Sequence, residues 1–390
     1  MPLKLDVLGQ QIEQMTRAAV AEDRNGALER ARQLMESVDP AELRAKLDER
    51  TVRLPWLVAD VGDSLAGAYA PAPCPANHSV VASDGSSVAP DRHTPVRFYV
   101  INTGYAILTY GERPSATLDS SPNLYFRDED LYLDPHVRSA PVEGSRLSAK
   151  MCLAEVGALW EGCQRVPGCP FVALRDGSLI TWGLQSEDPA FVQQQFLGEF
   201  LGHLDRFVER GIPVFSYISY PGARDVVNSL RVWLCPRETV DCEYCPTSES
   251  AQFCRTLAGI TDRELFGFLA EGQRSDVFGS KSAILDRYAL HRIEFFYMNV
   301  GGEVVRMEAP RWVTGDSEML GLAQAAIYDQ GLRSGMYPPY PPALQEAHEQ
   351  AVIPAADRQA IEVMVERALA EKGFTYLGSA KASSKRRRAV

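Results

Sequence analysis

Two hydrophobic periods alternate along the middle of the chain, and the change of period predicts the order of its elements. Short runs of β-branched and aromatic residues predict strands, whereas longer proline-free stretches predict helices. The predicted strands cover 79–84, 96–102, 105–110, 171–176 and 213–219, and the predicted helices cover 147–163 and 191–209. We expect Gly85 to end the first strand and Thr103-Gly104 to form a hairpin turn. The predicted order is therefore β-β-β-α-β-α-β.

This order resembles the ribonuclease-H-like fold, in which three antiparallel strands are extended by parallel strands reached through right-handed helical crossovers. The acidic residues that hold metal in that fold come from the first strand, the first helix and the fourth strand. Asp84, Glu155 and Asp176 occupy those places here. The sequence thus predicts an α/β protein with a mixed sheet, on which three carboxylates meet.

The two aspartates share a local motif, because Asp84 and Asp176 are each followed by the same Gly-Ser pair. A single Asp-Gly pair usually marks only a turn. Two such pairs at the ends of apolar strands, with an acidic helix between them, indicate converging metal ligands. That layout is typical of a metal-dependent nuclease.

Two glutamates on the predicted helix compete for the third acidic place. The helical neighbours of Glu155 are all apolar, namely Met151, Cys152, Ala158 and Leu159. A carboxylate on a buried face is unfavourable unless a charge compensates it, and a metal ion does so where two aspartates converge. Glu161 stays the alternative, although its neighbours Gln164 and Arg165 are typical of a solvated or ion-paired side chain.

A histidine near the end of the chain is a further candidate. Residues 337–353 read as a proline-rich start followed by a helix, in which Leu344, His348 and Val352 recur every four residues and share one face. We expect His348 to point inward, either as a ligand or as a hydrogen-bonded core residue.

Taken together, these segments resemble the NurA family of DNA-end-resection nucleases, which work with the HerA ATPase. The resemblance covers roughly residues 55–355. Its carriers are VASDGSS around Asp84, the Glu155 helix, FVALRDGSL around Asp176, YISYPGARDVV from Tyr217, IEFFYMNVGGEVVRMEAPRW from Ile293, and YPPALQEAHEQAVI. The resemblance implies a five-residue active site that falls on Asp84, Glu155, Asp176, Tyr340 and His348.

These residue types suit phosphodiester hydrolysis, in which two divalent cations about 4 Å apart activate a water and neutralise the leaving oxygen. Carboxylates favour Mg²⁺ or Mn²⁺, and an imidazole shifts the preference towards Mn²⁺. We expect Asp84 to bridge both ions, while Glu155 and Asp176 each complete one site. His348 would be a ligand or position the water, and Tyr340 would hold the scissile phosphate.

The resemblance also implies a biological setting: a manganese-dependent deoxyribonuclease with 5'-3' exonuclease and single-strand endonuclease activity, which resects DNA ends in double-strand break repair by homologous recombination. It implies a homodimer docked on a hexameric HerA-type ATPase. The net charge of −11 argues against DNA binding by overall electrostatics. A local basic channel or a threading partner is therefore expected. Arg224, Lys281 and Arg306 are candidate channel residues, each also explicable as a surface ion pair.

The ends of the chain predict three regions. Residues 1–55 form a helical arm, with helical pieces at 27–35 and 41–47, and with Val7, Ile12, Met15 and Ala19 on one apolar face. We expect this arm to pack on the core or on a second protomer. Residues 56–377 form the nuclease domain with a C-terminal helical extension. Residues 378–390 form a basic, disordered tail that contacts DNA or the ATPase.

Four of the eight cysteines lie in an insertion at 235–254, namely Cys235, Cys242, Cys245 and Cys254. They predict either a structural zinc site or iron-sulfur cluster, or thiols that are free or partly paired. The sequence shows no signal peptide and no segment of membrane-spanning length, so we expect a cytoplasmic protein with reduced thiols and no membrane contact.

Two other classes of function stay open. One is a catalytically inactive ribonuclease-H-like adaptor, against which the intact acidic positions argue. The other is a metal-binding interaction module centred on the cysteine insertion, in which the Asp-Gly pairs are only turns.

Overall fold

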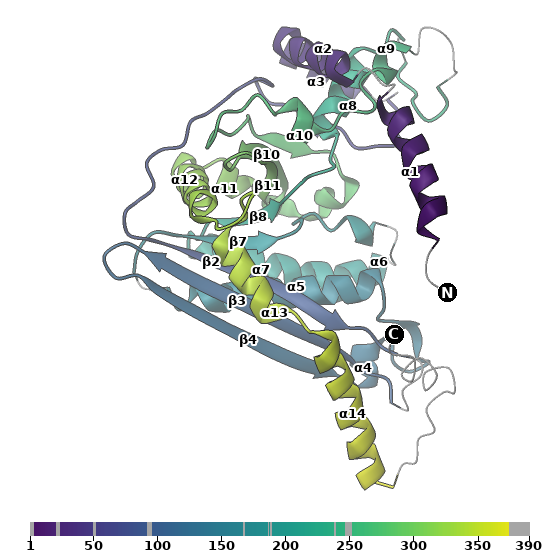
Figure 1. Ribbon diagram of the computed structural model, residues 1–390, viewed down its shortest axis with the longest axis vertical. Coiled ribbons are helices and arrows are strands. Elements are labelled where there is room, and N and C mark those ends of the chain that lie inside the picture. Colours follow the sequence, from purple (N-terminus) through teal and green to yellow (C-terminus); the bar gives the residue numbers. More distant parts are fainter. Residues whose placement is uncertain are drawn as a thin grey trace.

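A mixed sheet of nine strands forms the centre of the molecule, in the order β1-β9-β10-β11-β8-β7-β2-β3-β4 (Figure 1). The pairs β2/β7 and β7/β8 are parallel, and the other pairs of this sheet are antiparallel. The computed structural model describes residues 4–20, 24–49, 52–91, 96–166, 168–185, 187, 189–237, 239–245 and 252–373. The α/β prediction with a large mixed sheet is confirmed.

The strands of the main sheet are β1 (Ala59–Asp60), β2 (His78–Val88), β3 (Tyr99–Tyr110), β4 (Ser115–Tyr125), β7 (Phe171–Asp176), β8 (Val214–Ile218), β9 (Phe278–Ser280), β10 (Ile293–Asn299) and β11 (Val304–Pro310). A separate ribbon is formed by β5 (Tyr132–Asp134) and β6 (Ser139–Pro141).

The helices are α1 (Leu5–Val20), α2 (Arg24–Ser37), α3 (Pro40–Asp48), α4 (Asp128–Leu131), α5 (Ser145–Cys163), α6 (Pro189–Phe191), α7 (Gly198–Glu209), α8 (Asp225–Trp233), α9 (Gln252–Arg255), α10 (Asp262–Leu265), α11 (Arg311–Thr314), α12 (Ser317–Arg333), α13 (Pro342–Ala351) and α14 (Ala355–Glu371). A π-helical stretch, Val192–Leu197, joins α6 to α7. In the described part of the chain, no helix is both long and apolar enough to cross a bilayer.

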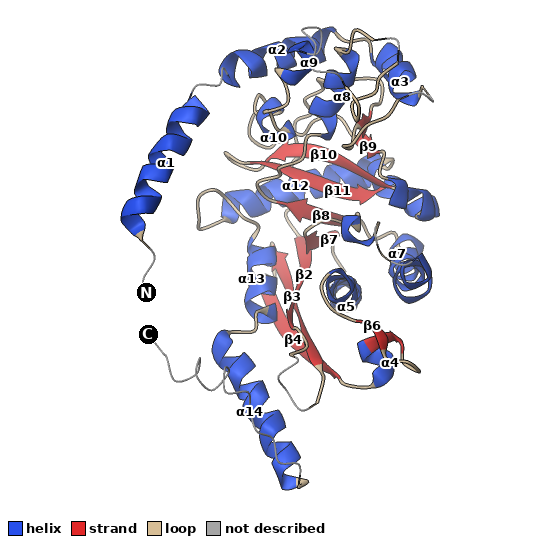
Figure 2. Cartoon of the chain, turned by 90° about the vertical axis from the view of Figure 1, so that its right-hand side faces the viewer, coloured by secondary structure: helices blue, strands red, loops and turns tan. Residues whose placement is uncertain are grey.

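Strand β2 shows why the central strands carry continuous hydrophobic runs. Val81 packs in the cluster with α5 and α7, whereas Val80 and Ala82 pack in the cluster with α12 and α13. Because successive side chains point to opposite faces, a strand covered on both faces must be apolar throughout. Figure 2 shows α13 on one side of β2 and β3, and α5 and α7 on the other.

The first three strands differ from the prediction. β2 continues through Gly85 to Val88, so this glycine does not end the strand. β3 runs without a break from Tyr99 to Tyr110, so no hairpin forms at Thr103-Gly104. The third strand is β4, whose side chains are exposed and mostly polar on both faces. A strand without alternation gives no periodic signal, and this is why the pattern missed it.

The later elements lie where the pattern placed them. β7 covers 171–176, β8 lies inside 213–219, and α5 contains 147–163. The stretch 191–209 is helical, although its first part is a π-helix. Gly301 and Gly302, both with positive φ, join the antiparallel β10 and β11.

The residues of the predicted arm lie in two different environments. α2 and α3 bury one face in the hydrophobic cluster that also contains α8, β9 and β10, and the carboxylate of Asp39 caps α3 by accepting from two backbone N–H groups. The described side chains of α1, residues 5–17, are all exposed. The predicted basic tail, 378–390, lies outside the described residues.

Candidate metal-binding active site

Asp84 and Asp176 lie side by side on neighbouring parallel strands. The registered pairs of β2 and β7 run from Ser79 with Phe171 to Ser83 with Arg175, so each aspartate follows the last of them. Neighbouring strands are about 4.8 Å apart. Each carboxylate also accepts a hydrogen bond from the next residue's N–H, at 2.8 Å for Asp84 and 2.9 Å for Asp176. The two Asp-Gly-Ser motifs therefore meet at one end of the sheet.

Helix α13 supplies a histidine to this pair. Nδ1 of His348 lies 2.7 Å from Oδ2 of Asp84. A proton on Nδ1 would be donated to this carboxylate, which leaves the lone pair of Nε2 for a cation or a water. The prediction that His348 faces inward is wrong, because its side chain is 56% exposed. The buried face of α13 is instead formed by Ala343, Leu344, Ala347 and Ala351.

The position of α13 is fixed by contacts with β2 and β3. The hydroxyl of Ser86 donates to the carbonyl of Ala351 at 2.5 Å, and the amide of Asn102 donates to the same carbonyl at 2.8 Å. Gly104 lies so close to the helix that a Cβ there would be 2.5 Å from the carbonyl oxygen of Ala347. The serine of the first motif thus holds the helix that carries His348.

Tyr340 lies on the other aspartate. Its hydroxyl interacts with the Asp176 carboxylate, and its ring packs edge-on against Tyr217 at 5.6 Å between centroids. Burial raises the pKa of Asp176, and Asp84 raises it further, while the Gly177 N–H and the Tyr340 hydroxyl oppose the shift. Burial, followed by Asp176, also raises the pKa of Tyr340. The phenol therefore stays protonated and acts as a hydrogen-bond donor.

Glu155 approaches from the α5 side and is paired with Arg175. Its Oε2 accepts from Nε and Nη2 of Arg175 at 2.8 and 2.6 Å, and the two side chains are only 4% and 10% exposed. Burial raises the pKa of Glu155, Arg175 lowers it, and Asp84 and Asp176 raise it again. Glu155 therefore belongs to the same electrostatic cluster as the two aspartates. The sequence did not reveal Arg175 as the cation that compensates it.

Gly85 makes room for the second oxygen of Glu155. A Cβ on Gly85 would lie 2.7 Å from Oε1 of Glu155, well inside contact distance. The hydroxyl of Ser83 also donates to the backbone carbonyl of Glu155 at 2.9 Å. The glycine of the first motif therefore serves close approach of the helix and does not terminate the strand.

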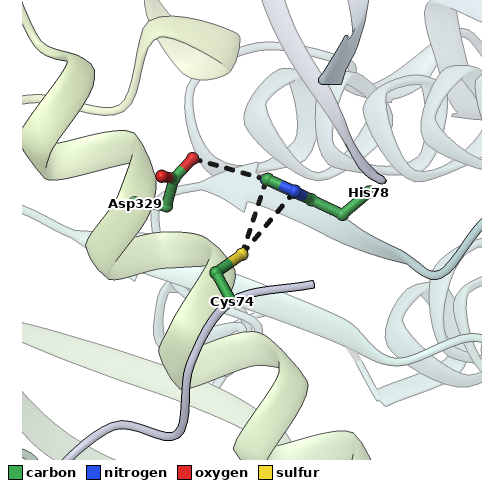
Figure 3. Close-up of side chains that lie close together, drawn as sticks. All are labelled: Cys74, His78 and Asp329. Atoms are coloured by element: carbon green, nitrogen blue, oxygen red, sulfur yellow. Dashed lines mark hydrogen bonds and ion pairs between the residues drawn. The ribbon is translucent and has the colours of Figure 1, made fainter. Parts of the chain in front are cut away.

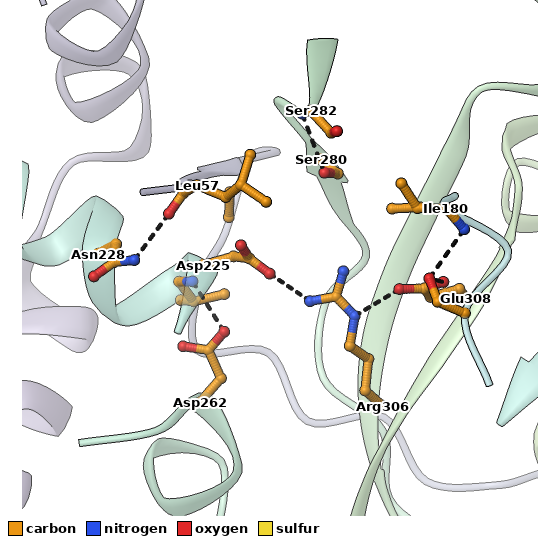
Figure 4. A network of polar contacts seen from close by, with 12 residues as sticks. Leu57, Ile180, Asp225, Asn228, Asp262, Ser280, Ser282, Arg306 and Glu308 are labelled. Atoms are coloured by element: carbon orange, nitrogen blue, oxygen red, sulfur yellow. Dashed lines mark hydrogen bonds and ion pairs between the residues drawn. The ribbon is translucent and has the colours of Figure 1, made fainter. Parts of the chain in front are cut away.

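The serine of the second motif, Ser178, is hydrogen-bonded to Glu308, which belongs to a buried ionic network with Arg306 and Asp225 that Figure 4 shows. Oε2 of Glu308 accepts from the Ser178 hydroxyl at 2.7 Å and from the Leu179 N–H at 3.0 Å. Oε1 of Glu308 accepts from Arg306 at 2.9 Å, and Arg306 also pairs with Asp225. The loop after Asp176 is thus fixed to β11 and α8.

The donor set fits a hard divalent cation, since three carboxylates and one imidazole converge. The ligand atoms do not form a closed cage. In the described residues, the only group with three ligand atoms within 4.8 Å of one another lies elsewhere, at Cys74, His78 and Asp329. Carboxylates without a cation repel one another, and Glu155 turns one oxygen to Arg175. Glu161, the alternative ligand, is exposed and lines a separate hollow with Lys150 and His203.

The three residues predicted to contact DNA lie in different environments. Arg306 is 2% exposed and its guanidinium is engaged in the core network, so its prediction as a channel residue is wrong. The pattern failed because Arg306 stands on a strand covered on both faces. Lys281 pairs with Asp48, and exposed Arg224 donates to the carbonyl of Ala258 at 2.7 Å.

The four cysteines of the insertion influence one another. Burial raises the pKa of Cys242 to about 11, and Cys235, Cys254 and Cys245 contribute to the rise. None of the eight cysteines, all of which the structure describes, forms a disulfide.

Comparisons with known proteins assign the family. The NurA domain profile matches residues 78–353, which is most of the chain and includes all five candidate site residues. The chain therefore belongs to the NurA domain family. Its resemblance to that family is confirmed. A comparison with curated proteins gives no match.

Several solved structures are similar. The NurA nuclease from Sulfolobus solfataricus is 15% identical, with a TM-score of 0.47 over 80% of this chain and 89% of that one. A structure of NurA with manganese is 13% identical, with a TM-score of 0.40 over 91% and 97%. A structure of NurA bound to dAMP and manganese is 13% identical, with a TM-score of 0.34 over 76% and 89%.

Proposed function

We propose that this protein is a divalent-metal-dependent DNA nuclease with its active site at Asp84, Glu155, Asp176, Tyr340 and His348. The observation that carries the proposal is the pairing of Asp84 and Asp176 on adjacent parallel strands, with His348 hydrogen-bonded to Asp84 and the Tyr340 hydroxyl interacting with Asp176. An adaptor would have no need to gather three carboxylates, among which Asp84 and Asp176 raise the pKa of Glu155 and Asp84 raises the pKa of Asp176. Membership of the NurA domain family agrees with this function.

Each of the five residues would have its own role in the reaction. Asp84, Glu155 and Asp176 would hold two Mn²⁺ or Mg²⁺ ions. When bound, such ions lower the pKa of a water and stabilise the leaving oxygen. His348, oriented by Asp84, would present Nε2 to a cation or to the attacking water. Tyr340, kept protonated by burial and by Asp176, would donate to a phosphate oxygen.

The proposal includes a ribonuclease-H-like fold. The order β4-β3-β2-β7-β8, with two antiparallel pairs followed by two parallel pairs, supports it. α5 and α7 provide the crossovers between the parallel strands, on the same face of the sheet. Residues 56–377 would form the nuclease domain, with 1–55 as an appended arm.

We place this activity in DNA-end resection during double-strand break repair. The protein would act in the cytoplasm as a homodimer with a HerA-type hexameric ATPase, as a 5'-3' exonuclease and single-strand endonuclease. The net charge of −11 supports a partner that delivers the DNA. Arg224 and Lys281 stay candidates for DNA contacts.

The cysteine insertion would add a structural metal. Cys235 and Cys245 raise the pKa of both Cys242 and Cys254, which supports one zinc ion or iron-sulfur cluster held by all four. Zinc content measured by mass spectrometry on the intact chain, with Cys242→Ser as the comparison, tests this assignment. Equal metal content in both proteins would refute it.

The decisive assay of function is degradation of single-stranded and blunt duplex DNA by the purified full chain. Asp63→Ala, which alters a fully exposed aspartate, is the control. Wild type and this control should degrade DNA in Mn²⁺ and be inactive in chelator. Asp84→Ala should be inactive while keeping its melting temperature. Equal degradation by Asp84→Ala, or activity that persists in chelator, would leave the nuclease proposal without support.

A further inference from the structure

A second cluster of metal-ligating side chains lies at the other end of β2, away from the Asp84 site. Figure 3 shows Cys74, from the segment that precedes β2, His78, the first residue of β2, and Asp329 on α12. Nε2 of His78 is 3.7 Å from Sγ of Cys74 and 3.4 Å from Oδ2 of Asp329. The three ligand atoms all lie within 4.8 Å of one another. His78 is only 2% exposed.

These separations match a tetrahedral zinc site. Zinc bonds of about 2.3 Å to sulfur and about 2.0–2.2 Å to nitrogen and oxygen place neighbouring ligand atoms about 3.3–3.6 Å apart at tetrahedral angles. The observed 3.7 and 3.4 Å match two of the three separations, and the third, between Sγ of Cys74 and the Asp329 carboxylate, is no more than 4.8 Å.

The surroundings orient each ligand. Nδ1 of His78 lies 2.8 Å from the carbonyl of Pro75, so the Nδ1 proton is donated there and Nε2 keeps its lone pair for a metal. The His78 ring stacks on Tyr110 at 5.0 Å. Arg333 holds Asp329 by donating to both oxygens, and a carboxylate has enough lone pairs to accept these bonds and still bind a cation.

We propose that Cys74, His78 and Asp329 bind one zinc ion, separate from the Asp84 centre and independent of the nuclease activity. A thiolate and a neutral imidazole are donors that zinc prefers, whereas a thiolate suits Mn²⁺ poorly. Binding releases the Cys74 thiol proton to solvent. Three protein ligands leave the fourth position to water. The ion would clamp α12 to the start of the strand that carries Asp84.

Cobalt is a suitable probe, since a Co²⁺–thiolate bond gives a charge-transfer absorption that the Asp84 site, whose proposed ligands include no thiolate, would not produce. The full chain carrying Cys235→Ser and Cys242→Ser, which disables the cysteine insertion, is stripped with chelator and titrated with Co²⁺. This background protein should show the thiolate band and hold one Zn²⁺ by native mass spectrometry. Adding Cys74→Ser should abolish the band, and adding Asp329→Asn should weaken Co²⁺ binding at least about tenfold.

Cys169→Ser is the matched control, because it exchanges another partly exposed thiol whose sulfur contacts β2. It should leave band and stoichiometry unchanged. If the protein with Cys74→Ser does not fold, the Co²⁺ affinity of the Asp329→Asn protein decides. If the background protein does not fold, Cys74→Ser is introduced into the wild-type chain instead, and it should reduce the bound Zn²⁺ by one ion per chain. A background protein without a thiolate band, or Cys74→Ser binding Co²⁺ as well as its parent, would overturn the proposal.

Discussion

Arg175→Met isolates the electrostatic design of the candidate active site. The substitution keeps most of the apolar volume and removes the only cation hydrogen-bonded to buried Glu155 in the described residues. A buried carboxylate that loses its partner destabilises the folded state by about 3–5 kcal/mol. An unfolding entropy of about 2.1 cal/mol/K per residue gives about 0.8 kcal/mol/K for 390 residues. The melting temperature in chelator should therefore fall by about 4–6 °C.

Two treatments, lower pH and added Mn²⁺, should restore part of this lost stability. Without Arg175, the pKa of Glu155 rises further above its ordinary value, so the folded state holds a proton that the unfolded state has lost. Stability of the variant should therefore increase as the pH falls through the raised pKa, and should do so more than in wild type. Mn²⁺ should also stabilise the variant more than wild type, because the cation replaces the missing positive charge.

Differential scanning calorimetry in chelator and in Mn²⁺, at pH 8 and pH 5.5, measures both effects. Arg165→Met is the control, since Arg165 is about half exposed and its ion pair with Asp119 is worth about 1 kcal/mol or less. Arg175→Met combined with Glu155→Gln should recover most of the stability, since neutral replacement of a buried pair is often nearly neutral. A melting temperature unchanged within about 1 °C, or a loss that neither acid nor Mn²⁺ relieves, would refute the reasoning.

Three further predictions follow from the geometry. Mn²⁺ at 100 times its dissociation constant should stabilise wild type by about 2.7 kcal/mol, or about 3 °C by calorimetry, and no shift would contradict metal binding. Gly85→Ala should reduce DNA cleavage at least about tenfold by displacing Glu155. Gly168→Ala is the control, because a Cβ there meets nothing within 4 Å, and it should leave cleavage unchanged. Equal activities of the two variants would refute the close approach of Glu155 to Gly85. Tyr340→Phe should move the acidic limb of the pH–activity profile to higher pH. The Tyr340 hydroxyl lowers the pKa of Asp176, so its removal lets that pKa rise, and an unmoved or acid-shifted limb would speak against this role.

The sequence was informative wherever a hydrophobic period and a motif coincided. β7, β8 and α5 lie where their apolar patterns placed them, and the two Asp-Gly-Ser motifs meet as expected because parallel neighbours end at the same edge. The role of Glu155 as a buried carboxylate followed from its apolar neighbours on the helix. Long-range convergence was thus predictable where it depended on topology.

Other features depend on contacts that no local pattern encodes. β4 is exposed on both faces and lacks alternation, so no strand was predicted there. Gly85 and Gly104 resembled turn residues. They are glycines because helices on opposite faces of the sheet approach them too closely for a side chain. Arg306 on β11 resembled a surface cation, because a buried partner such as Glu308 is recognisable only once the strands are packed.

The central claim is that acidic side chains hold divalent cations against the phosphate that is cut. It is tested most directly with a DNA strand in which sulfur replaces one non-bridging oxygen of the scissile phosphate. Mg²⁺ prefers hard oxygen ligands, whereas Mn²⁺ accepts sulfur more readily. Cleavage of the sulfur-containing strand should be slower by about tenfold or more in Mg²⁺, about 1.4 kcal/mol in the barrier, and should recover in Mn²⁺. Equal rates for both strands in Mg²⁺, or a sulfur effect that Mn²⁺ does not relieve, would contradict the claim.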